Sequence, residues 1–300
     1  DREISTSDPK FYKWTEWIFK QLFLDGFAKQ IDMPVNWCEE LGTVLANDEV
    51  IDGKSERGGF PVVRKNMKQW VIDIPAYAEK LLKGLDTIDW PDSTKEIQRN
   101  WIGKSEGVEV DFNIVGGGKF SIYTTCVETI YGITFMVLAP ENKLVDELKS
   151  RIKNWDEVVK YREETAKKSD IDRTELNKGK TGVKLDGVMA INPVNNKEVP
   201  IFLGDFVLAS YGTGAVMAVP AHDERDYEYA IYHNIPMIQV IDGRDVSKSA
   251  FEKQDYLGKG CKLINSEEFT GLTVEEAKKE ITEKLVNMGV GRKKVNYRLR

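Results

Sequence analysis

The stretch YGTGAVMAVPAHDERD, residues 211–226, carries the side chains best suited to chemistry. A small apolar run ends in a turn that holds His222, Asp223, Arg225 and Asp226. Pro220 permits a helix to begin just after it, and Asp223 and Asp226 would then share one face of that helix. A carboxylate fixed in such a turn is a natural partner for an ammonium group.

The same turn also has a purely structural explanation. Carboxylates in the first turn of a helix are stabilised by the helix dipole, and an aspartate can cap the free N–H groups there. Spacing alone leaves the ammonium-binding and the capping interpretations both open.

A second candidate is the threonine-rich stretch YTTCVETIYG, residues 123–132. Thr124, Thr125 and Thr129 bring three hydroxyls together, with Glu128 among them. Hydroxyls donate and accept hydrogen bonds, so they suit a ribose, an ester carbonyl or a water molecule. Threonine also favours β-strands, and taken alone the pattern favours an ordinary strand.

Other kinds of site find little support in the sequence. The three cysteines, Cys38, Cys126 and Cys261, are far apart, whereas structural zinc needs two close pairs. The glycines before Lys119 predict a hairpin turn rather than a phosphate-binding loop, and no Ser-His-Asp set is evident. His233 is expected to be structural. We therefore expect neither a metal nor a cofactor in this chain.

The composition is that of a globular protein, with 300 residues, 41% hydrophobic, 31% charged and a net charge of −6. This length suggests about two domains. No apolar run approaches the roughly 18 residues that span a bilayer, and no secretory signal is seen, so we expect a cytoplasmic protein without a membrane partner. The chain starts without methionine and stops within a strand-like run, which suggests a piece of a longer protein.

The stretch GRKKVNYRLR, residues 291–300, is locally basic. A basic strip can contact phosphates even on an acidic protein, but a solvated strand has the same composition. Both interpretations stay open.

Hydrophobic periodicity predicts the elements that must position these side chains. A first amphipathic helix is expected over 8–30, with Gly26 as its stop. Short strands are expected over 34–66 and a strand-to-helix passage over 68–84, before a domain boundary within 89–107. From residue 108 the pattern predicts hairpin strands, a buried strand, two charged helices, two further strands and a capped helix over 273–289. This mixed order predicts an α+β second domain with a barrel-like form.

Taken together, these motifs resemble the editing insertion, called connective polypeptide 1, of bacterial-type leucyl-tRNA synthetases. Residues 35–59 are similar to the zinc-ribbon-like module that precedes the insertion, and residues 98–107 and 291–300 look like the strands that enter and leave it. The His-Ile-Gly-His and Lys-Met-Ser-Lys-Ser ligation motifs of the family are absent, so leucine activation is not expected of this chain.

The resemblance implies a role for each candidate residue. The predicted catalytic set is Thr124, Thr125 and Asp226, in which Asp226 holds the α-amino group and the two threonines bind the carbonyl or the attacking water. Thr129 would exclude the leucine side chain by its bulk. The other predicted substrate-binding residues are Glu128, Tyr211 facing the terminal adenosine, Met217 and Val219 lining the side-chain pocket, His222, Asp223 supporting the site, and Arg225 pairing with a local carboxylate.

The sequence also departs from the pattern of the family. Where Thr-Thr-Arg-Pro-Asp-Thr is usual, residues 124–129 read Thr-Thr-Cys-Val-Glu-Thr. The missing arginine at Cys126 removes a guanidinium that could contact a phosphate or a carboxylate. The cysteine pairs of the ribbon are mostly absent, so that module must rely on apolar packing.

The resemblance implies a domain order and a fold class. We expect a catalytic-domain remnant helix (1–33), a degenerate zinc-ribbon-like module (34–66), a catalytic-domain remnant and linker (67–100), an editing domain (101–293) and a return strand (294–300). The expected fold class is α/β to α+β, with a barrel-like β-rich editing domain, surrounding helices and a Rossmann-type remnant.

The implied function is hydrolysis of the ester of misacylated tRNA(Leu), for example the norvalyl ester, with the leucyl ester spared. Such a second site is needed because a synthetic site separates substrates that differ by one methylene by only about 1–3 kcal/mol. The partners would be the tRNA(Leu) 3′-terminal adenosine and the remainder of the synthetase, a ligase that uses ATP and Mg. Two alternatives are a module that only docks the tRNA end and an insertion that only orients the synthetase.

Overall fold

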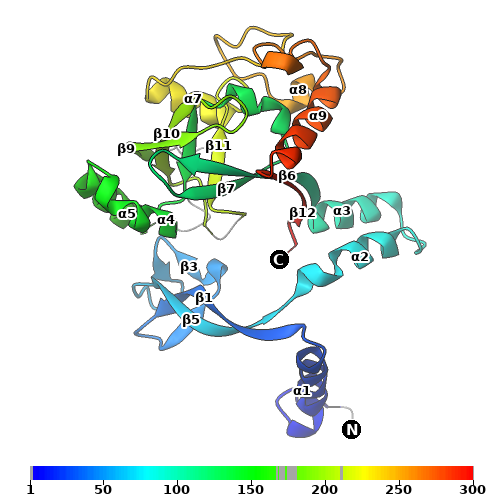
Figure 1. Ribbon diagram of the computed structural model, residues 1–300. Helices are drawn as coiled ribbons and strands as arrows, with labels where there is room; N and C mark the ends of the chain where they lie inside the picture. Colours follow the sequence, from blue (N-terminus) through cyan, green and yellow to red (C-terminus); the bar gives the residue numbers. More distant parts are fainter. Residues whose placement is uncertain (1–2, 167, 169–172, 174–180, 210–211, 300) are drawn as a thin grey trace. The chain divides into compact units, whose positions relative to one another are not determined.

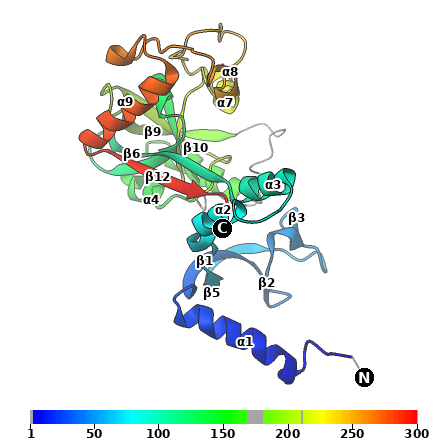
Figure 2. The same ribbon diagram turned by 90° about the vertical axis from the view of Figure 1, so that its right-hand side faces the viewer.

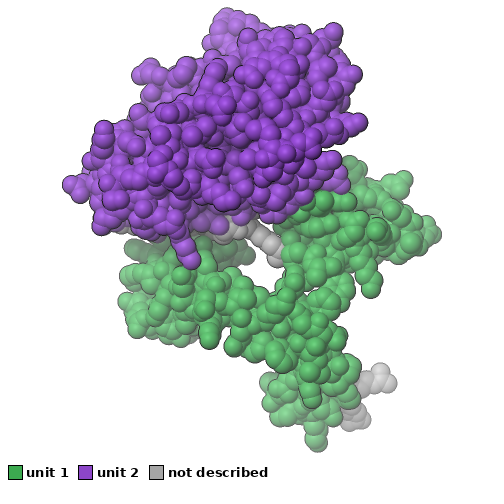
Figure 3. All heavy atoms as spheres, viewed as in Figure 1, with its two compact units in different colours: residues 1–105, 295–300 green, residues 106–294 purple. Residues whose placement is uncertain are grey.

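The computed structural model describes residues 3–166, 168, 173, 181–209 and 212–299. The chain divides into two compact units, of which unit 1 comprises residues 1–105 and 295–300 and unit 2 comprises residues 106–294 (Figure 3). The domain limits expected from the sequence remain predictions. Among the described residues, no helix combines the length and the apolarity needed to cross a bilayer.

Unit 1 begins with helix α1, Pro9–Leu24. Asp8 caps it by accepting a hydrogen bond from the Lys10 N–H at 2.8 Å, and Pro9 occupies the first turn, as the sequence predicts. Gly26 adopts a φ of +79° just after the helix, where a residue without Cβ is favoured. The stop predicted at Gly26 is therefore confirmed, and the residues after it within the range 8–30 lie outside the helix.

A small antiparallel sheet with the order β2-β1-β5 follows α1. Its strands are β1 (Ala28–Cys38), β2 (Thr43–Leu45) and β5 (Val63–Ile72), with a separate hairpin of β3 (Val50–Ile51) and β4 (Lys54–Ser55). The short strands predicted over 34–66 are therefore present. In the turn after β4, the buried Ser55 hydroxyl donates to the Arg57 carbonyl at 2.7 Å and accepts from the Phe60 N–H at 3.0 Å. These hydrogen bonds close that turn.

The rest of unit 1 is helical, with the 3₁₀ turns η1 (Asn47–Glu49) and η2 (Ile74–Tyr77) before helices α2 (Ala78–Leu85) and α3 (Asp92–Ile102). The strand-to-helix passage is confirmed, but the periodicity missed α3. Gly103 ends α3 with a φ of +58°. The returning chain is anchored there, because the Arg298 N–H donates to the Ile102 carbonyl at 3.0 Å.

Unit 2 is built on a mixed sheet with the strand order β11-β8-β10-β9-β6-β12, and β7 pairs with β6. The strands are β6 (Lys104–Ile114), β7 (Lys119–Thr124), β8 (Phe135–Leu138), β9 (Gly182–Ile191), β10 (Glu198–Gly204), β11 (Ala215–Ala218) and β12 (Gly291–Tyr297). β10 and β8 are parallel, whereas the pairs β11–β8, β10–β9 and β6–β7 are antiparallel.

The hydrogen-bonded order is open among the described strands, so the predicted barrel is not confirmed, and neither is the Rossmann-type remnant. The sheet is nevertheless curved, since Cα atoms of β7 and β11 approach within 8 Å of each other. This approach brings the ends of two strands that carry candidate residues close together.

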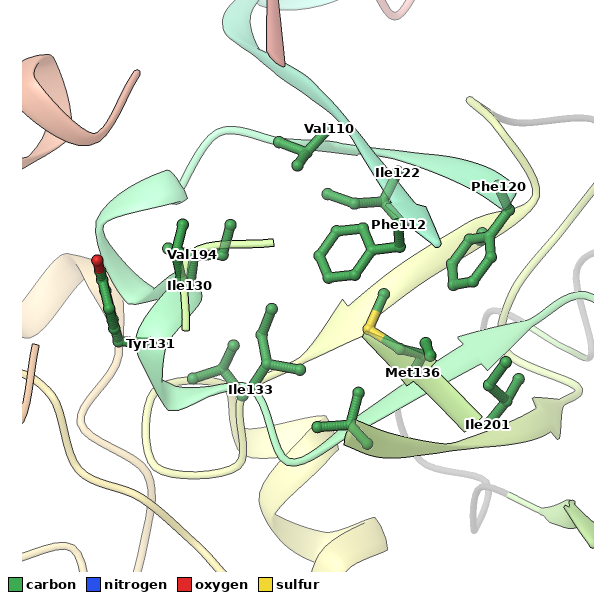
Figure 4. Close-up of a cluster of buried hydrophobic side chains, with 14 of the residues drawn as sticks. Val110, Phe112, Phe120, Ile122, Ile130, Tyr131, Ile133, Met136, Val194 and Ile201 are labelled. Carbon is green, nitrogen blue, oxygen red and sulfur yellow. The ribbon is translucent and has the colours of Figure 1, made fainter. Parts of the chain in front are cut away.

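The predicted hairpin of β6 and β7 turns at Gly116, Gly117 and Gly118, which all have positive φ. Alternate residues of β6 face the core, where Phe112 stacks on Phe120 with ring centroids 5.9 Å apart. Ile122 of β7 and Met136 of β8 lie beside Phe112 in the same apolar cluster (Figure 4). This burial holds β7, and therefore the threonines at its end, against the centre of unit 2.

Helices cover the sheet of unit 2 (Figures 1 and 2). They are α4 (Lys143–Glu147), α5 (Trp155–Thr165), α7 (Glu224–Tyr232), α8 (Lys253–Tyr256) and α9 (Val274–Asn287), with 3₁₀ turns η3 (Val127–Gly132), η4 (Lys149–Arg151) and η5 (Glu267–Phe269). α7 and α8 lie at the same end of unit 2 in both views, and α9 packs on η3.

The capping box at the start of α9 predicts a measurable contribution to stability. The Thr273 hydroxyl accepts from the Glu276 N–H at 3.3 Å, while the Glu276 carboxylate accepts from the Thr273 N–H at 3.0 Å. We expect Thr273→Ala to lower the free energy of unfolding of the chain by about 1 kcal/mol in urea titrations. Lys279→Ala, an exposed change on the same helix, is the control. Equal effects of the two variants would contradict this account.

Candidate active site

The chain leaves β11 through a tight turn that leads into α7. The His222 N–H donates to the Val219 carbonyl at 2.8 Å and closes the turn. Asp223 is the N-cap of α7, and its carboxylate accepts from the N–H groups of Arg225 at 3.0 Å and Asp226 at 3.4 Å. The predicted helix and the predicted capping by an aspartate are therefore both present.

Asp226 is buried beneath this turn. Its Oδ2 accepts a hydrogen bond from the Val219 N–H at 2.8 Å, while Oδ1 accepts none from the described residues. Burial, and then the negative charge of Asp223, raise the pKa of the Asp226 carboxyl well above its usual value. A cation next to Oδ1 would offset both effects.

The guanidinium of Arg225 forms a forked pair with the capping aspartate. Its Nε lies 3.2 Å from Asp223 Oδ1 and its Nη2 lies 2.9 Å from Asp223 Oδ2. These contacts raise the pKa of Arg225. The local carboxylate pairing is thus present, and any contact of Arg225 with a substrate stays a prediction.

His222 is buried, and both of its ring nitrogens bind backbone groups. Nε2 accepts from the Val240 N–H at 3.0 Å, so Nδ1 carries the proton and donates to the Phe251 carbonyl, also at 3.0 Å. Burial lowers the pKa of His222 to about 4, so the ring is neutral near pH 7. This geometry gives no support to the predicted substrate contact, because neither ring nitrogen is available for one.

The threonine-rich stretch leaves its strand at Thr124 and continues as the 3₁₀ turn η3, so the interpretation of the whole stretch as an ordinary strand is wrong. The Thr124 hydroxyl accepts from the Cys126 N–H at 3.0 Å. The Thr129 hydroxyl, which is buried, donates to the Cys126 carbonyl at 2.9 Å. Two of the three hydroxyls therefore shape the turn, and the Thr124 hydroxyl donates its proton to no described residue.

Glu128 faces the interior beneath the turn. Its Oε1 accepts from the Tyr256 hydroxyl at 3.2 Å, while Oε2 is buried with no hydrogen-bond partner among the described residues. Burial raises the pKa of Glu128 and also that of Tyr256. The carboxyl packs inside unit 2, and its predicted substrate contact stays a prediction.

The structure brings the threonine turn and the Asp226 turn together. The Thr134 N–H donates to the Ala218 carbonyl at 3.3 Å. Gly132 at the end of η3 lies so close to Val219 that an added Cβ would meet its Cγ1 at 3.0 Å. Val219 belongs to the hydrophobic core of unit 2, and the half-buried Met217 packs against that core. Tyr211 lies outside the described residues.

Two lysines that sequence analysis missed reach the same turn. The Lys278 Nζ donates to the Thr125 carbonyl at 2.7 Å, and the Lys253 Nζ lies 3.5 Å from the Thr125 Oγ1. They are 153 and 128 positions from Thr125 along the chain, and no local motif marks them.

The described residues include no cluster of three or more histidine, cysteine, aspartate or glutamate side chains that could hold a metal ion.

The bonds of His222 predict a pH-dependent contribution to stability. Because its pKa falls from 6.5 to about 4 on folding, the unfolded chain takes up the proton first as the pH decreases. The contribution of neutral His222 is complete above pH 6.5 and is lost between pH 6.5 and 4, by roughly 3 kcal/mol.

Urea unfolding of the wild type and of His222→Gln between pH 7 and 4 measures this contribution. The difference in the free energy of unfolding should shrink as the pH falls. Taking a difference removes the opposite effects of Asp226 and Glu128, whose carboxyl pKa values are raised. A difference that stays constant with pH would rule the account out.

Two known protein families match this chain in sequence. The sequence pattern of the family described as "Leucyl-tRNA synthetase, editing domain" matches residues 99–286. The pattern of "tRNA synthetases class I (I, L, M and V)" matches residues 1–173. Each match covers more than half of the chain.

Individual relatives agree with the family patterns. A leucine–tRNA ligase of Alkaliphilus oremlandii is 49% identical over 299 residues, an alignment that covers 100% of this chain and 37% of the relative. The crystal structure of a ternary complex of Agrobacterium radiobacter K84 agnB2 LeuRS with tRNA and LeuAMS has a TM-score of 0.72 and 32% sequence identity. That match covers 98% of this chain and 33% of the solved chain.

The chain thus spans about a third of the length of these two relatives. The editing-domain pattern includes the threonine turn and the turn with Asp226, which the structure places side by side. The chain belongs to the leucyl-tRNA synthetase family and contains its editing domain.

Proposed function

We propose that unit 2 hydrolyses the ester bond of misacylated tRNA(Leu), for example norvalyl-tRNA(Leu), and spares the leucyl ester. The observation that carries this proposal is the buried carboxylate of Asp226, which has one oxygen bound to the Val219 N–H and the other free of partners among the described residues. An aminoacyl ester, unlike a peptide, presents a free ammonium group beside its carbonyl, and a charge-assisted hydrogen bond to Asp226 would orient it.

The threonine turn supports the chemistry of an ester. The Thr124 hydroxyl accepts a hydrogen bond from the Cys126 N–H and can donate its own proton to the ester carbonyl or to water. Thr125 lies next to it with an ammonium group 3.5 Å from its hydroxyl. Because the ester is activated, a water molecule held by the hydroxyls of Thr124 and Thr125 and by the free ribose hydroxyl can attack without a protein nucleophile.

The packing of Thr129 suits a steric limit on the amino-acid side chain. Its hydroxyl is tied to the Cys126 carbonyl, so the β-branched side chain has one fixed orientation. A rigid methyl group can exclude the branched end of leucine and admit a linear side chain. This role would remove errors that the synthetic site cannot reject.

The wider role follows from the family. We infer that the parent enzyme is an ATP- and Mg-dependent leucine–tRNA ligase in the cytoplasm, and that the 3′-terminal adenosine of tRNA(Leu) enters unit 2. The predicted adenosine contact of Tyr211 belongs to this proposal. A docking module without hydrolysis is the second candidate, because Cys126 and the buried Glu128 replace the usual arginine and aspartate.

Asp226→Asn separates these candidates. The amide oxygen of asparagine can still accept from the Val219 N–H, so the fold is kept while the charge is removed. We expect deacylation of norvalyl-tRNA(Leu) to fall about 100-fold because a charge-assisted contact to the substrate is lost. Glu228→Gln, an exposed change on α7, is the control and should leave the rate unchanged. A change in tRNA affinity alone would favour the docking module, and no effect at all would favour a structural insertion.

Substitutions of Thr129 test the steric limit. Thr129→Ala removes the β-branch and should allow hydrolysis of leucyl-tRNA(Leu), which the wild type spares. Thr129→Val keeps the shape and removes only the hydroxyl, so it should still spare the leucyl ester. Initial rates of leucine release from charged tRNA give the comparison. If the alanine variant also spares leucyl-tRNA(Leu), Thr129 does not limit the side chain.

A further inference from the structure

We propose that Lys253 binds the phosphodiester on the 5′ side of the terminal adenosine and so takes the place of the arginine that is missing at Cys126. This inference rests on the proposed function, since it needs the tRNA end to lie at the threonine turn. It makes Lys253 a positioning residue for the ester rather than a group that takes part in the reaction.

The ammonium group of Lys253 is held at the site without a fixed partner. It is half-buried, and its contact with the Thr125 Oγ1 is 3.5 Å long, well beyond the roughly 2.8 Å of a strong charge-assisted hydrogen bond. It forms no direct ion pair with the described residues, although its charge partly offsets the rise that burial causes in the pKa of Glu128. A partly desolvated cation that lacks a direct ion pair is stabilised when an anion arrives.

Several other basic groups of unit 2 are already paired with carboxylates. Arg292 pairs with both Glu109 and Asp111, and Lys294 pairs with Glu109. The charge of the basic strip, residues 291–300, is therefore partly neutralised by carboxylates of unit 2. This pairing weakens the interpretation that the strip contacts phosphates. Arg225 is likewise bound to Asp223.

Lys278 has a different part in the same turn. Its ammonium group donates to the Thr125 carbonyl at 2.7 Å, which is a full charge-assisted hydrogen bond. It therefore fixes the backbone of the turn, while Lys253 keeps its donors available. The two lysines together place positive charge next to Thr125, where Cys126 supplies none.

The chemistry of the substrate fits this location. The ester and the phosphodiester are attached to the same ribose, so an ester carbonyl at Thr124 and Thr125 brings the phosphate near this turn. A flexible lysine side chain can follow a phosphate as a point charge without the planar geometry that an arginine requires.

Two probes test the proposal, of which only the second carries a phosphodiester, together with the cytidine that it links. One is the norvalyl ester of adenosine, and the other is the norvalyl ester of the dinucleotide CpA. We expect the 300-residue chain to hydrolyse the CpA ester with a KM about tenfold lower, an advantage that added salt should reduce. Lys253→Gln should abolish this difference in KM and leave kcat unchanged, while Lys253→Arg should keep it. Lys259→Gln, an exposed change beyond α8, should behave like the wild type.

Two results would overturn the proposal. One is an intact CpA advantage in Lys253→Gln, and the other is an equal loss of kcat on both probes, which would instead indicate stabilisation of the reacting carbonyl. If the wild type hydrolyses neither ester, the proposed function fails while the phosphate site is tested by binding. CpA without an attached amino acid should then bind the wild type about tenfold more tightly than adenosine does, and Lys253→Gln should remove that difference. Equal binding of CpA and adenosine to the wild type would refute the site.

Discussion

The hydrogen bond from the Val219 N–H to Asp226 Oδ2 joins the end of β11 to the first turn of α7. A buried carboxylate is costly unless it is bound, and this single donor satisfies only one of its oxygens. The turn between the two elements must therefore hold its shape around an acidic group whose pKa is raised by burial and by Asp223. The other oxygen accepts no hydrogen bond from the described residues, and the proposed function assigns it to the ammonium group of the substrate.

Buried polar contacts connect that turn and the threonine turn to neighbouring segments of unit 2. His222 binds Val240 with one ring nitrogen and Phe251 with the other, so three segments meet at a neutral imidazole. Tyr256 reaches from α8 to Glu128 below the threonine turn. His222, Tyr256 and Glu128 are thus structural, because their polar atoms bind groups inside unit 2. The proposed chemistry depends instead on one carboxylate and a few hydroxyls. Such a frame matters because positioning is the main contribution that this site offers.

Local rules of sequence predicted the local structure well. The capping box at Thr273, the glycine hairpin and the helix cap at Asp223 depend on neighbouring residues, and the structure confirms them. Contacts between distant segments were not readable in the same way. The role of His222 requires knowledge of two loops, and Lys253 reaches Thr125 across 128 positions, so neither could be assigned from a motif. Helix α3 was missed because the turn residues at both of its ends dominated the pattern.

The central claim is that the turn with Asp226 and the threonine turn together form a selective esterase. The most direct measurement follows release of the amino acid from norvalyl-tRNA(Leu) and from leucyl-tRNA(Leu), each with the same 300-residue chain. The account predicts hydrolysis of the norvalyl ester above the spontaneous rate and none of the leucyl ester. Hydrolysis of neither ester, or of both at the same rate, would contradict it.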